Sequence, residues 1–190
     1  MRRTVFAAAA SLLALPAIAE PQDYVLDASH SQVIFSYNHL GFSTTYGMFS
    51  GFEGTISFDQ ADPANSSVSV SIPVMSMFTG WEKRDAHLFS PDFFNATDDS
   101  VASFTSTAIE VTGENTALIT DDLTVNGVTQ SVTLDTVMNK TGTHPMAKVD
   151  WAGFNATTTL LRSDFGVGNF APFVSDEVQL QISVEAQIAE

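Results

Sequence analysis

The sequence predicts an all-β protein, an eight-stranded antiparallel up-and-down barrel with one short helical excursion. Three observations predict this fold. Short apolar runs are separated by Gly, Pro, Asn and Asp, two of these runs alternate strictly between apolar and polar residues, and no low-complexity tract or fixed repeat interrupts them.

Eight segments are candidate strands. Residues 67–72 read Ser-Val-Ser-Val-Ser-Ile, and Val178, Leu180, Ile182 and Val184 alternate near the end of the chain. A period of two is that of a strand with one buried face. The predicted strands span residues 33–39, 49–58, 67–72, 101–111, 117–125, 128–138, 151–161 and 178–188.

The connections between these segments carry turn signals. Asn126-Gly127 lies between two predicted strands and is typical of a type I′ hairpin turn, whose two central residues both need a positive φ. Residues 80–89 are charged and lack alternation, so we expect a helix of two or three turns within an excursion near residues 80–95. Strands joined mainly by short turns suit a closed barrel that can hold one small ligand, with a β-sandwich as the alternative.

The first nineteen residues have the features of a secretory signal peptide. Arg2 and Arg3 are followed by a short apolar run and by Ala17-Ile18-Ala19 at the cleavage positions. We therefore expect residues 1–19 to be a signal peptide and residues 20–190 to form a soluble periplasmic domain without stable membrane insertion. The arginine pair leaves both general secretion and twin-arginine export open.

Charge and cysteine content limit the partners. After removal of Arg2 and Arg3, five Lys and Arg residues stand against 22 Asp and Glu, a formal charge of −17. Nucleic acid is therefore an unfavourable partner, and so is an anionic membrane for the body as a whole, although a local basic mouth is compatible with this charge. Without cysteine, stability must come from an ordinary core, which the fifteen phenylalanines can supply.

Six motifs occur in an order that resembles a known family. Together they extend over most of the chain after residue 20, and the ordered series is similar to the YceI-like family of bacterial periplasmic proteins. The resemblance implies a lipocalin-like barrel that binds a polyisoprenoid or another long-chain amphiphile in an apolar channel. The motifs lie at residues 24–31, 39–42 (HLGF), 47–54, 84–94 (RDAHLFSPDFF), 122–129 (DLTVNGVT) and 162–166 (RSDFG).

The candidate binding residues form two groups, apolar residues for the tail of such a lipid and polar residues for its head group. A long tail gains about 0.8 kcal/mol for each CH₂ group removed from water, so burial alone could bind it. A diphosphate or carboxylate head group would favour arginine, with histidine as a further donor. The candidate lining residues are Phe35, Tyr37, Phe49, Met75, Phe78 and Phe94, and the candidate head-group residues are His39, Arg84, His87 and Arg162.

The polar motifs also allow a structural interpretation. Arg84-Asp85 and Arg162-Ser163-Asp164 could form ion pairs that tie the helix to the end of the barrel, instead of a charged rim for a head group. His30, His39 and His87 with Asp27 and Asp85 could suggest a metal site or acid/base chemistry, but HxH, HxxxH and HExxH spacings are all missing, so we expect neither a protein-held metal nor a cofactor.

Two other classes of function remain as alternatives. The His30-Ser31 and Ser163-Asp164 pairs could suggest catalysis on an apolar substrate, but GxSxG, SxxK and a glycine-rich phosphate loop are absent from the sequence, so we expect no enzyme. A protein-partner module of a periplasmic stress or membrane redox system would require an exposed apolar patch in place of an internal channel. A homodimer is compatible with either binding function.

Overall fold

The computed structural model describes residues 20–190, and the predicted signal peptide lies outside these residues. Ten strands occur in this part of the chain, with one α-helix, α1 (Glu82–Phe89), and three short 3-10 turns, η1 (Pro63–Asn65), η2 (Val74–Ser76) and η3 (Arg162–Phe165). The strands are β1 (Gln22–Leu26), β2 (Gln32–His39), β3 (Ser43–Phe49), β4 (Glu53–Phe58), β5 (Ser67–Pro73), β6 (Val101–Gly113), β7 (Thr116–Val125), β8 (Val128–Thr143), β9 (Asp150–Leu161) and β10 (Glu177–Ile188).

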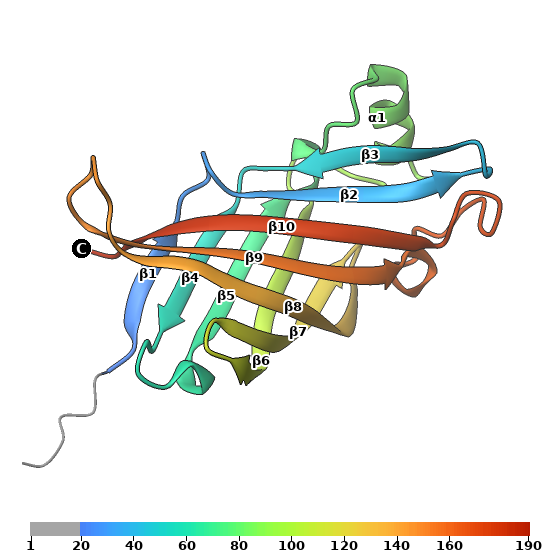
Figure 1. The fold of residues 1–190 in the computed structure, drawn as a ribbon. Coiled ribbons are helices and arrows are strands. Elements are labelled where there is room, and N and C mark those ends of the chain that lie inside the picture. The colour runs from blue at the N-terminus through green and yellow to red at the C-terminus, as the bar shows by residue number, and fades with distance from the viewer. Residues whose placement is uncertain (1–19) are drawn as a thin grey trace, which may run out of the picture.

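The sheet closes on itself through β1, which pairs with both β4 and β10 (Figure 1). Strand β2 continues beyond β1 along the same edge of β10, and β3 pairs with β2. Thus β1 and β2 are two parts of one interrupted strand, as are β3 and β4. Counted in this way, residues 20–190 form the predicted eight-stranded antiparallel up-and-down barrel. Closure leaves few unpaired edges.

The observed strands differ from the predicted strands at these two interruptions. The short strand β1 lies outside the predicted runs, and the predicted run 49–58 joins the end of β3 to β4. Residues 27–31 and 50–52 break the two strands, so that β2 and β3 extend past the ring as a hairpin (Figure 1). This hairpin lengthens one side of the barrel toward the end that carries α1.

The hairpin between β7 and β8 follows from its turn residues. Asn126 has φ 52° and Gly127 has φ 74°, and Val125 pairs with Val128. Two consecutive positive φ values are the backbone conformation of the type I′ turn, which matches the twist of the flanking strands. The predicted hairpin is confirmed.

The inner face of the barrel is apolar, and it divides along its length. A buried cluster around Tyr24, Phe52, Ile56 and Phe58 lies at the end where β1 begins and β10 ends. Tyr24 and Phe154 both meet the Phe58 ring edge-on, with ring centroids 6.4 and 5.7 Å from it. These edge-to-face contacts favour one fixed arrangement of the aromatic core at this end.

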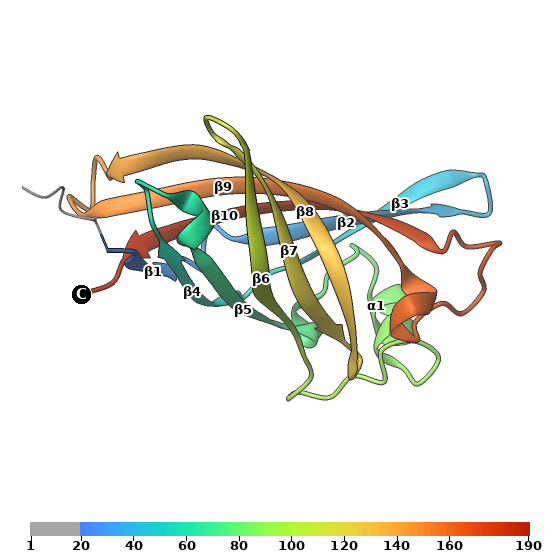
Figure 2. The same cartoon turned by 90° about the horizontal axis from the view of Figure 1, so that it is seen from below.

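Helix α1 covers the other end, beside η3 and the segment that follows it (Figure 2). Glu82 and Asp85 occupy its first turn, where the helix dipole favours negative charge. Leu88 and Phe89 pack against the buried cluster of Phe35, Met77 and Val178. The predicted helical excursion is confirmed. Within residues 20–190, none of the helical segments combines the length and hydropathy that a membrane crossing requires.

Candidate functional site

The barrel encloses a cavity of about 1060 Å³. Sites for small ligands typically measure roughly 300–1,000 Å³, so this cavity is large for its class. Its walls are inward-facing residues of alternating strand positions, such as Val68, Val70 and Ile72 of β5. A strand with period two therefore presents an unbroken apolar surface to the interior.

Aromatic residues of β2 and β3 form one wall of the cavity. The Phe35 ring stacks with Tyr37 at 6.5 Å and meets Phe49 at 5.4 Å, and Phe49 contacts Phe94 edge-on at 6.4 Å. Gly47 makes room for this group, because a Cβ atom there would overlap the Phe35 ring. The four aromatic residues were predicted as ligand contacts, and the structure places all of them in the lining.

Two predicted lining residues lie elsewhere. Met75 and Phe78 are exposed and take no part in the cavity wall, whereas Val74 and Met77 are buried and line it. The chain leaves β5 at η2, and this 3-10 turn buries Val74 while Met75 remains on the outside. Phe78 instead pairs its backbone with Met48 of β3, with both N–H···O distances at 2.9 Å.

Arg162 lines the cavity and also holds the loop that follows η3. Its Nε donates to the Ser175 carbonyl at 3.0 Å, Nη2 to Val174 at 3.0 Å, and Nη1 to Val167 at 2.7 Å and Asn169 at 3.3 Å. Burial lowers the pKa of this guanidinium, while Asp176 and Tyr37 act to raise it. The side chain therefore has a structural role whatever else it contacts.

Arg84 is held in a similar way by Thr79. Its Nε donates to Thr79 Oγ1 and its Nη2 to the Thr79 carbonyl, both at 2.8 Å. The Thr79 hydroxyl donates in turn to Asp85, and the Arg84 guanidinium lies 5.9 Å from the centre of the Trp81 ring. Among residues 20–190 neither Arg84 nor Arg162 forms a salt bridge, so the predicted ion pairs are replaced by bonds to hydroxyl and carbonyl oxygens.

The two histidines predicted for a head group lie at the same end of the cavity. His87 Nε2 is 3.0 Å from Asp92 Oδ2, and the ring meets Phe93 at 5.1 Å. His39 ends β2, where its backbone forms an isolated bridge with Val174. Both residues line the cavity, as do Arg84 and Arg162, so the structure brings the four polar candidates together.

The two ends of the cavity differ in chemistry. At the α1 end lie five exposed apolar residues that we call the aromatic rim, four of which also line the cavity; they are Leu40, Phe42, Trp81, Phe170 and Phe173, with Phe42 outside the lining. At the far end the lining residues are Pro63 and Ser66 of the η1 segment and Glu114 and Asn115 of the β6–β7 turn. Exposed aromatic residues in the lining are thus found at the α1 end, together with the polar candidates, whereas the η1 segment and the β6–β7 turn add Ser66, Glu114 and Asn115 at the far end.

The inner wall also holds a carboxyl group that sequence reasoning missed. Asp121 of β7 is 0 % exposed, and neither carboxyl oxygen has a hydrogen-bond partner among residues 20–190. Burial, with a smaller effect from Asp122, raises its pKa to about 7. The position of Asp121 in the sequence could have indicated its burial, because Asp121 lies between the inward-facing Ile119 and Leu123 on the same face of the strand.

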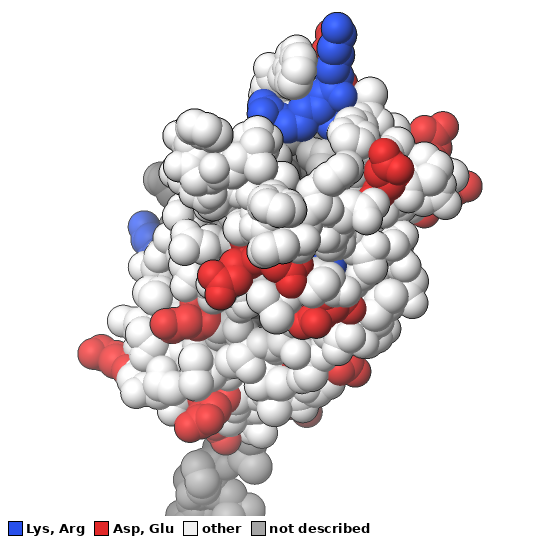
Figure 3. All heavy atoms as spheres, turned by 90° about the vertical axis from the view of Figure 1, so that its right-hand side faces the viewer, with Lys and Arg blue, Asp and Glu red and all other residues white. Residues whose placement is uncertain are grey.

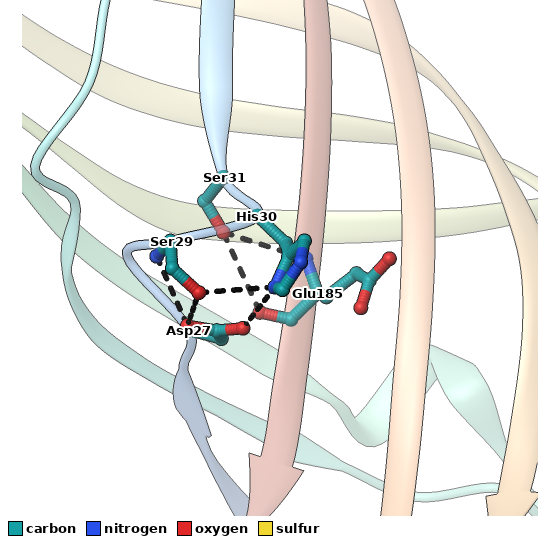
Figure 4. Close-up of polar contacts among 5 residues, drawn as sticks. All are labelled: Asp27, Ser29, His30, Ser31 and Glu185. Atoms are coloured by element: carbon teal, nitrogen blue, oxygen red, sulfur yellow. Dashed lines mark hydrogen bonds and ion pairs between the residues drawn. The ribbon is translucent and has the colours of Figure 1, made fainter. Parts of the chain in front are cut away.

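A polar cluster joins the two parts of the first interrupted strand (Figure 4). Asp27 accepts hydrogen bonds from Ser29 N at 2.9 Å and Ser29 Oγ at 2.7 Å, and its Oδ2 lies 2.6 Å from His30 Nδ1. Ser31 Oγ donates to the Glu185 carbonyl of β10 at 3.4 Å. These bonds fix the chain where it passes from β1 to β2.

The same cluster does not have the geometry of a catalytic triad, and it is not arranged as a dedicated metal site. In a triad the histidine uses one nitrogen for the acid and the other for the nucleophile, whereas here Nδ1 faces both Asp27 and Ser29. Ligand atoms of Asp27, His30 and Glu185 lie within 4.8 Å of one another. Because the His30 nitrogen is already bonded to Asp27, the simplest role of the group is structural.

The fold and the cavity define a lipocalin-like barrel with an internal apolar site. Residues 24–186 match the YceI-like domain, and the chain belongs to this family. A "UPF0312 protein" of Pseudomonas savastanoi pv. phaseolicola is 41% identical over 165 residues, which cover 86% of this chain and 85% of that protein. Another from Ectopseudomonas mendocina is also 41% identical, covering 86% of both chains. The predicted family is confirmed.

Solved structures share the fold. BcnA of Burkholderia cenocepacia superposes with a TM-score of 0.76 at 27% identity, covering 85% of this chain and 99% of that one. The YCEI protein of Campylobacter jejuni gives 0.72 at 29% identity, covering 80% and 90%. A polyisoprenoid binding domain from Saccharophagus degradans gives 0.68 at 16% identity, covering 87% and 98%, a likeness of fold alone.

Proposed function

We propose that this protein is a binding or carrier protein for a long-chain apolar lipid, a polyisoprenoid or an isoprenoid quinone, and not an enzyme. The observation that carries the proposal is the cavity of about 1060 Å³ with its apolar walls. Each CH₂ group that moves from water into such a cavity contributes about 0.8 kcal/mol, so a tail of many such units binds through burial alone. The similarity in fold to a polyisoprenoid binding domain supports the same ligand class.

The polar groups near the α1 end fit the head group of this lipid. Arg84 keeps its Nη1 amino group without a hydrogen-bond partner among residues 20–190, and His39 and His87 line the cavity nearby. An arginine donor next to histidine suits a phosphate, carboxylate or quinone oxygen. The tail would then extend along the barrel toward Phe58 and Phe154.

Export belongs to the same proposal. Residues 1–19 direct the chain to the periplasm and are removed, so that residues 20–190 form the lipid-binding domain. An intact mass of the periplasmic protein that begins at Glu20 is the expected result. A periplasmic protein that retains residues 1–19 would contradict the proposed cleavage.

The direct test uses delipidated protein and lipids of increasing chain length. Titration with polyprenyl phosphates and isoprenoid quinones, followed by Trp81 fluorescence and native mass spectrometry, should give saturable binding that tightens with tail length. Organic extraction of protein purified from its own periplasm identifies the natural adduct and the number of chains in the complex. Failure of every lipid longer than about sixteen carbons to bind would contradict the carrier function.

A protein-partner module is the second candidate, and the observation that favours it is the aromatic rim. Exposed apolar residues that gather at one end of a domain often mark an interaction surface. Binding of a periplasmic partner protein with equal affinity to lipid-loaded and delipidated protein would favour this function over lipid carriage.

A further inference from the structure

The aromatic rim is assembled from three segments that are far apart in the sequence. The turn between β2 and β3 contacts the loop after η3, since Leu40 N donates to the Phe173 carbonyl at 3.0 Å. That loop contacts the segment after α1 through Phe170 and Phe93, whose rings are 5.9 Å apart. The three segments therefore lie next to one another at the α1 end of the barrel (Figures 1 and 2).

The rim exposes its aromatic rings in spite of the cost in water. Phe42 is 89% exposed and Phe173 is 74% exposed, and Trp81 and Phe170 are exposed as well. Three of these four also line the cavity, so exposed aromatic side chains belong to the same wall as the buried apolar ones. Exposed aromatic residues that gather at one end of a folded domain often mark the contact with an apolar partner.

Positive charge accompanies the rim on an otherwise acidic protein. Lys83 and Arg84 begin α1 beside Trp81, and Lys83 is exposed and lines the cavity. Figure 3 views this end and shows the Lys and Arg side chains gathered at its top, with Asp and Glu side chains spread below and to one side. Of the acids nearby in sequence, Asp85 bonds to Thr79 and Asp92 to His87, while Glu82 is exposed next to Lys83.

We propose that the aromatic rim docks on the surface of a lipid bilayer, with Phe42 and Phe173 entering the interfacial layer and Lys83 facing anionic lipid head groups. The proposal rests on the lipid-carrier function and adds the surface through which the ligand enters and leaves. A long apolar lipid that crosses water exposes its whole tail, whereas a rim seated on the bilayer lets the tail pass directly into the cavity.

The contrast between the two ends of the barrel favours a bilayer at the α1 end. At the far end the lining includes Ser66, Glu114 and Asn115, which would lose hydration and gain repulsion at an anionic membrane. Aromatic residues with a nearby lysine are the side chains that prefer the membrane–water interface. The same chain thus has one end suited to a membrane and one end suited to water.

The test is vesicle flotation of residues 20–190 with phosphatidylcholine vesicles and with vesicles that also contain phosphatidylglycerol. The wild type should float with both and more strongly with the anionic vesicles, and this difference should disappear in high salt. Phe42→Ser should weaken partitioning roughly tenfold, and Phe42→Ser with Phe173→Ser should abolish it. Lys83→Glu should weaken binding only to the anionic vesicles.

Met146→Ser is the matched control, because Met146 is 82% exposed but lies in the loop between β8 and β9, away from the rim. This variant should float like the wild type. Lipid binding to the cavity is measured separately by titration without vesicles, and Phe42→Ser should retain it, since Phe42 lies outside the lining. Saturable lipid binding without flotation would overturn the docking surface and leave the carrier function intact. Equal losses in Phe42→Ser and Met146→Ser would also overturn it.

Discussion

Asp121 of β7 lies directly opposite Val132 of β8 on the inner face of the barrel. Its other cross-strand neighbour, Ser106 of β6, uses its hydroxyl oxygen to accept a hydrogen bond from Val68 N at 2.8 Å. Neither oxygen of the buried carboxyl group has a hydrogen-bond partner among residues 20–190, so its charged form is strongly disfavoured.

This arrangement predicts that the protein loses stability as the pH rises through about 7. The pKa of Asp121 is raised from its ordinary value to about 7 in the folded state, so its contribution is fully present below about pH 4 and is lost as the carboxyl ionises. Three pKa units correspond to at most about 4 kcal/mol. Denaturant unfolding at pH 5 and pH 8 should show the loss, and Asp121→Asn should show much less of it.

The comparison with Asp121→Asn is needed because the titration of His30 also lowers the stability of the protein as the pH rises. The pKa of His30 is raised by the hydrogen bond and charge of Asp27, so its contribution also fades as the pH rises. A pH dependence that is identical in the wild type and Asp121→Asn would contradict the role of Asp121.

The joint between β1 and β2 gives a second prediction, in the acid range. Burial tends to raise the pKa of Asp27, but hydrogen bonds from His30 and Ser29 outweigh it and lower the pKa. The contribution of Asp27 is thus present above its ordinary pKa and is lost as the pH falls through the lowered value. His30→Ala should raise the pKa of Asp27 in an NMR titration, while His144→Ala should leave it unchanged.

The fold could be predicted largely because its signals are local. Alternation in 67–72 and the Asn126-Gly127 turn depend on a few adjacent residues, and both appear in the structure as expected. The breaks at 27–31 and 50–52 were missed because they are defined by pairing with strands far away in the sequence, since β1 and β2 both pair with β10 and β4 pairs with β1 while β3 pairs with β2.

The site could be predicted only in part. Large apolar side chains on regular strands, such as Phe35, were found from residue type, whereas the same reasoning failed for Met75, which η2 leaves exposed. Arg162 was named as a candidate residue, but its hydrogen-bond partners could not be predicted. They are backbone carbonyl groups of a loop, which every residue type carries. Asp121 was missed because its burial is set by the neighbouring strands β6 and β8.

Arg162 provides the third prediction. Its planar fork reaches the carbonyl groups of Val167, Val174 and Ser175 from three different nitrogens, which one ammonium group cannot reproduce. Arg162→Lys should therefore lower the free energy of unfolding by about 2–4 kcal/mol, measured by denaturant titration. Lys140→Ala is the control, because this exposed side chain makes no such bonds, and its effect should stay within about 0.5 kcal/mol. Equal stability of Arg162→Lys and the wild type would show that the loop is held by other contacts.

The cavity itself gives the fourth prediction, in which two phenylalanines of similar sequence context are expected to differ. Phe49 lines the cavity and packs on Phe35 and Phe94, whereas the Phe78 side chain is exposed and lies outside the lining. Phe49→Asp would place an unpaired charge beside the lipid tail and should abolish saturable binding, since such a charge is costly to bury. Phe78→Asp keeps its new carboxylate in water and should bind lipid like the wild type.

Circular dichroism and the unfolding midpoint must accompany both titrations, because Phe49→Asp could also unfold the barrel. Phe49→Ala removes the same ring without adding a charge, and it should retain the fold and weaken binding of long tails more than binding of short ones. If folded Phe49→Ala and Phe49→Asp both bind lipid as tightly as Phe78→Asp, the tail does not occupy this cavity. The expected order of affinity is wild type and Phe78→Asp first, then Phe49→Ala, with Phe49→Asp last.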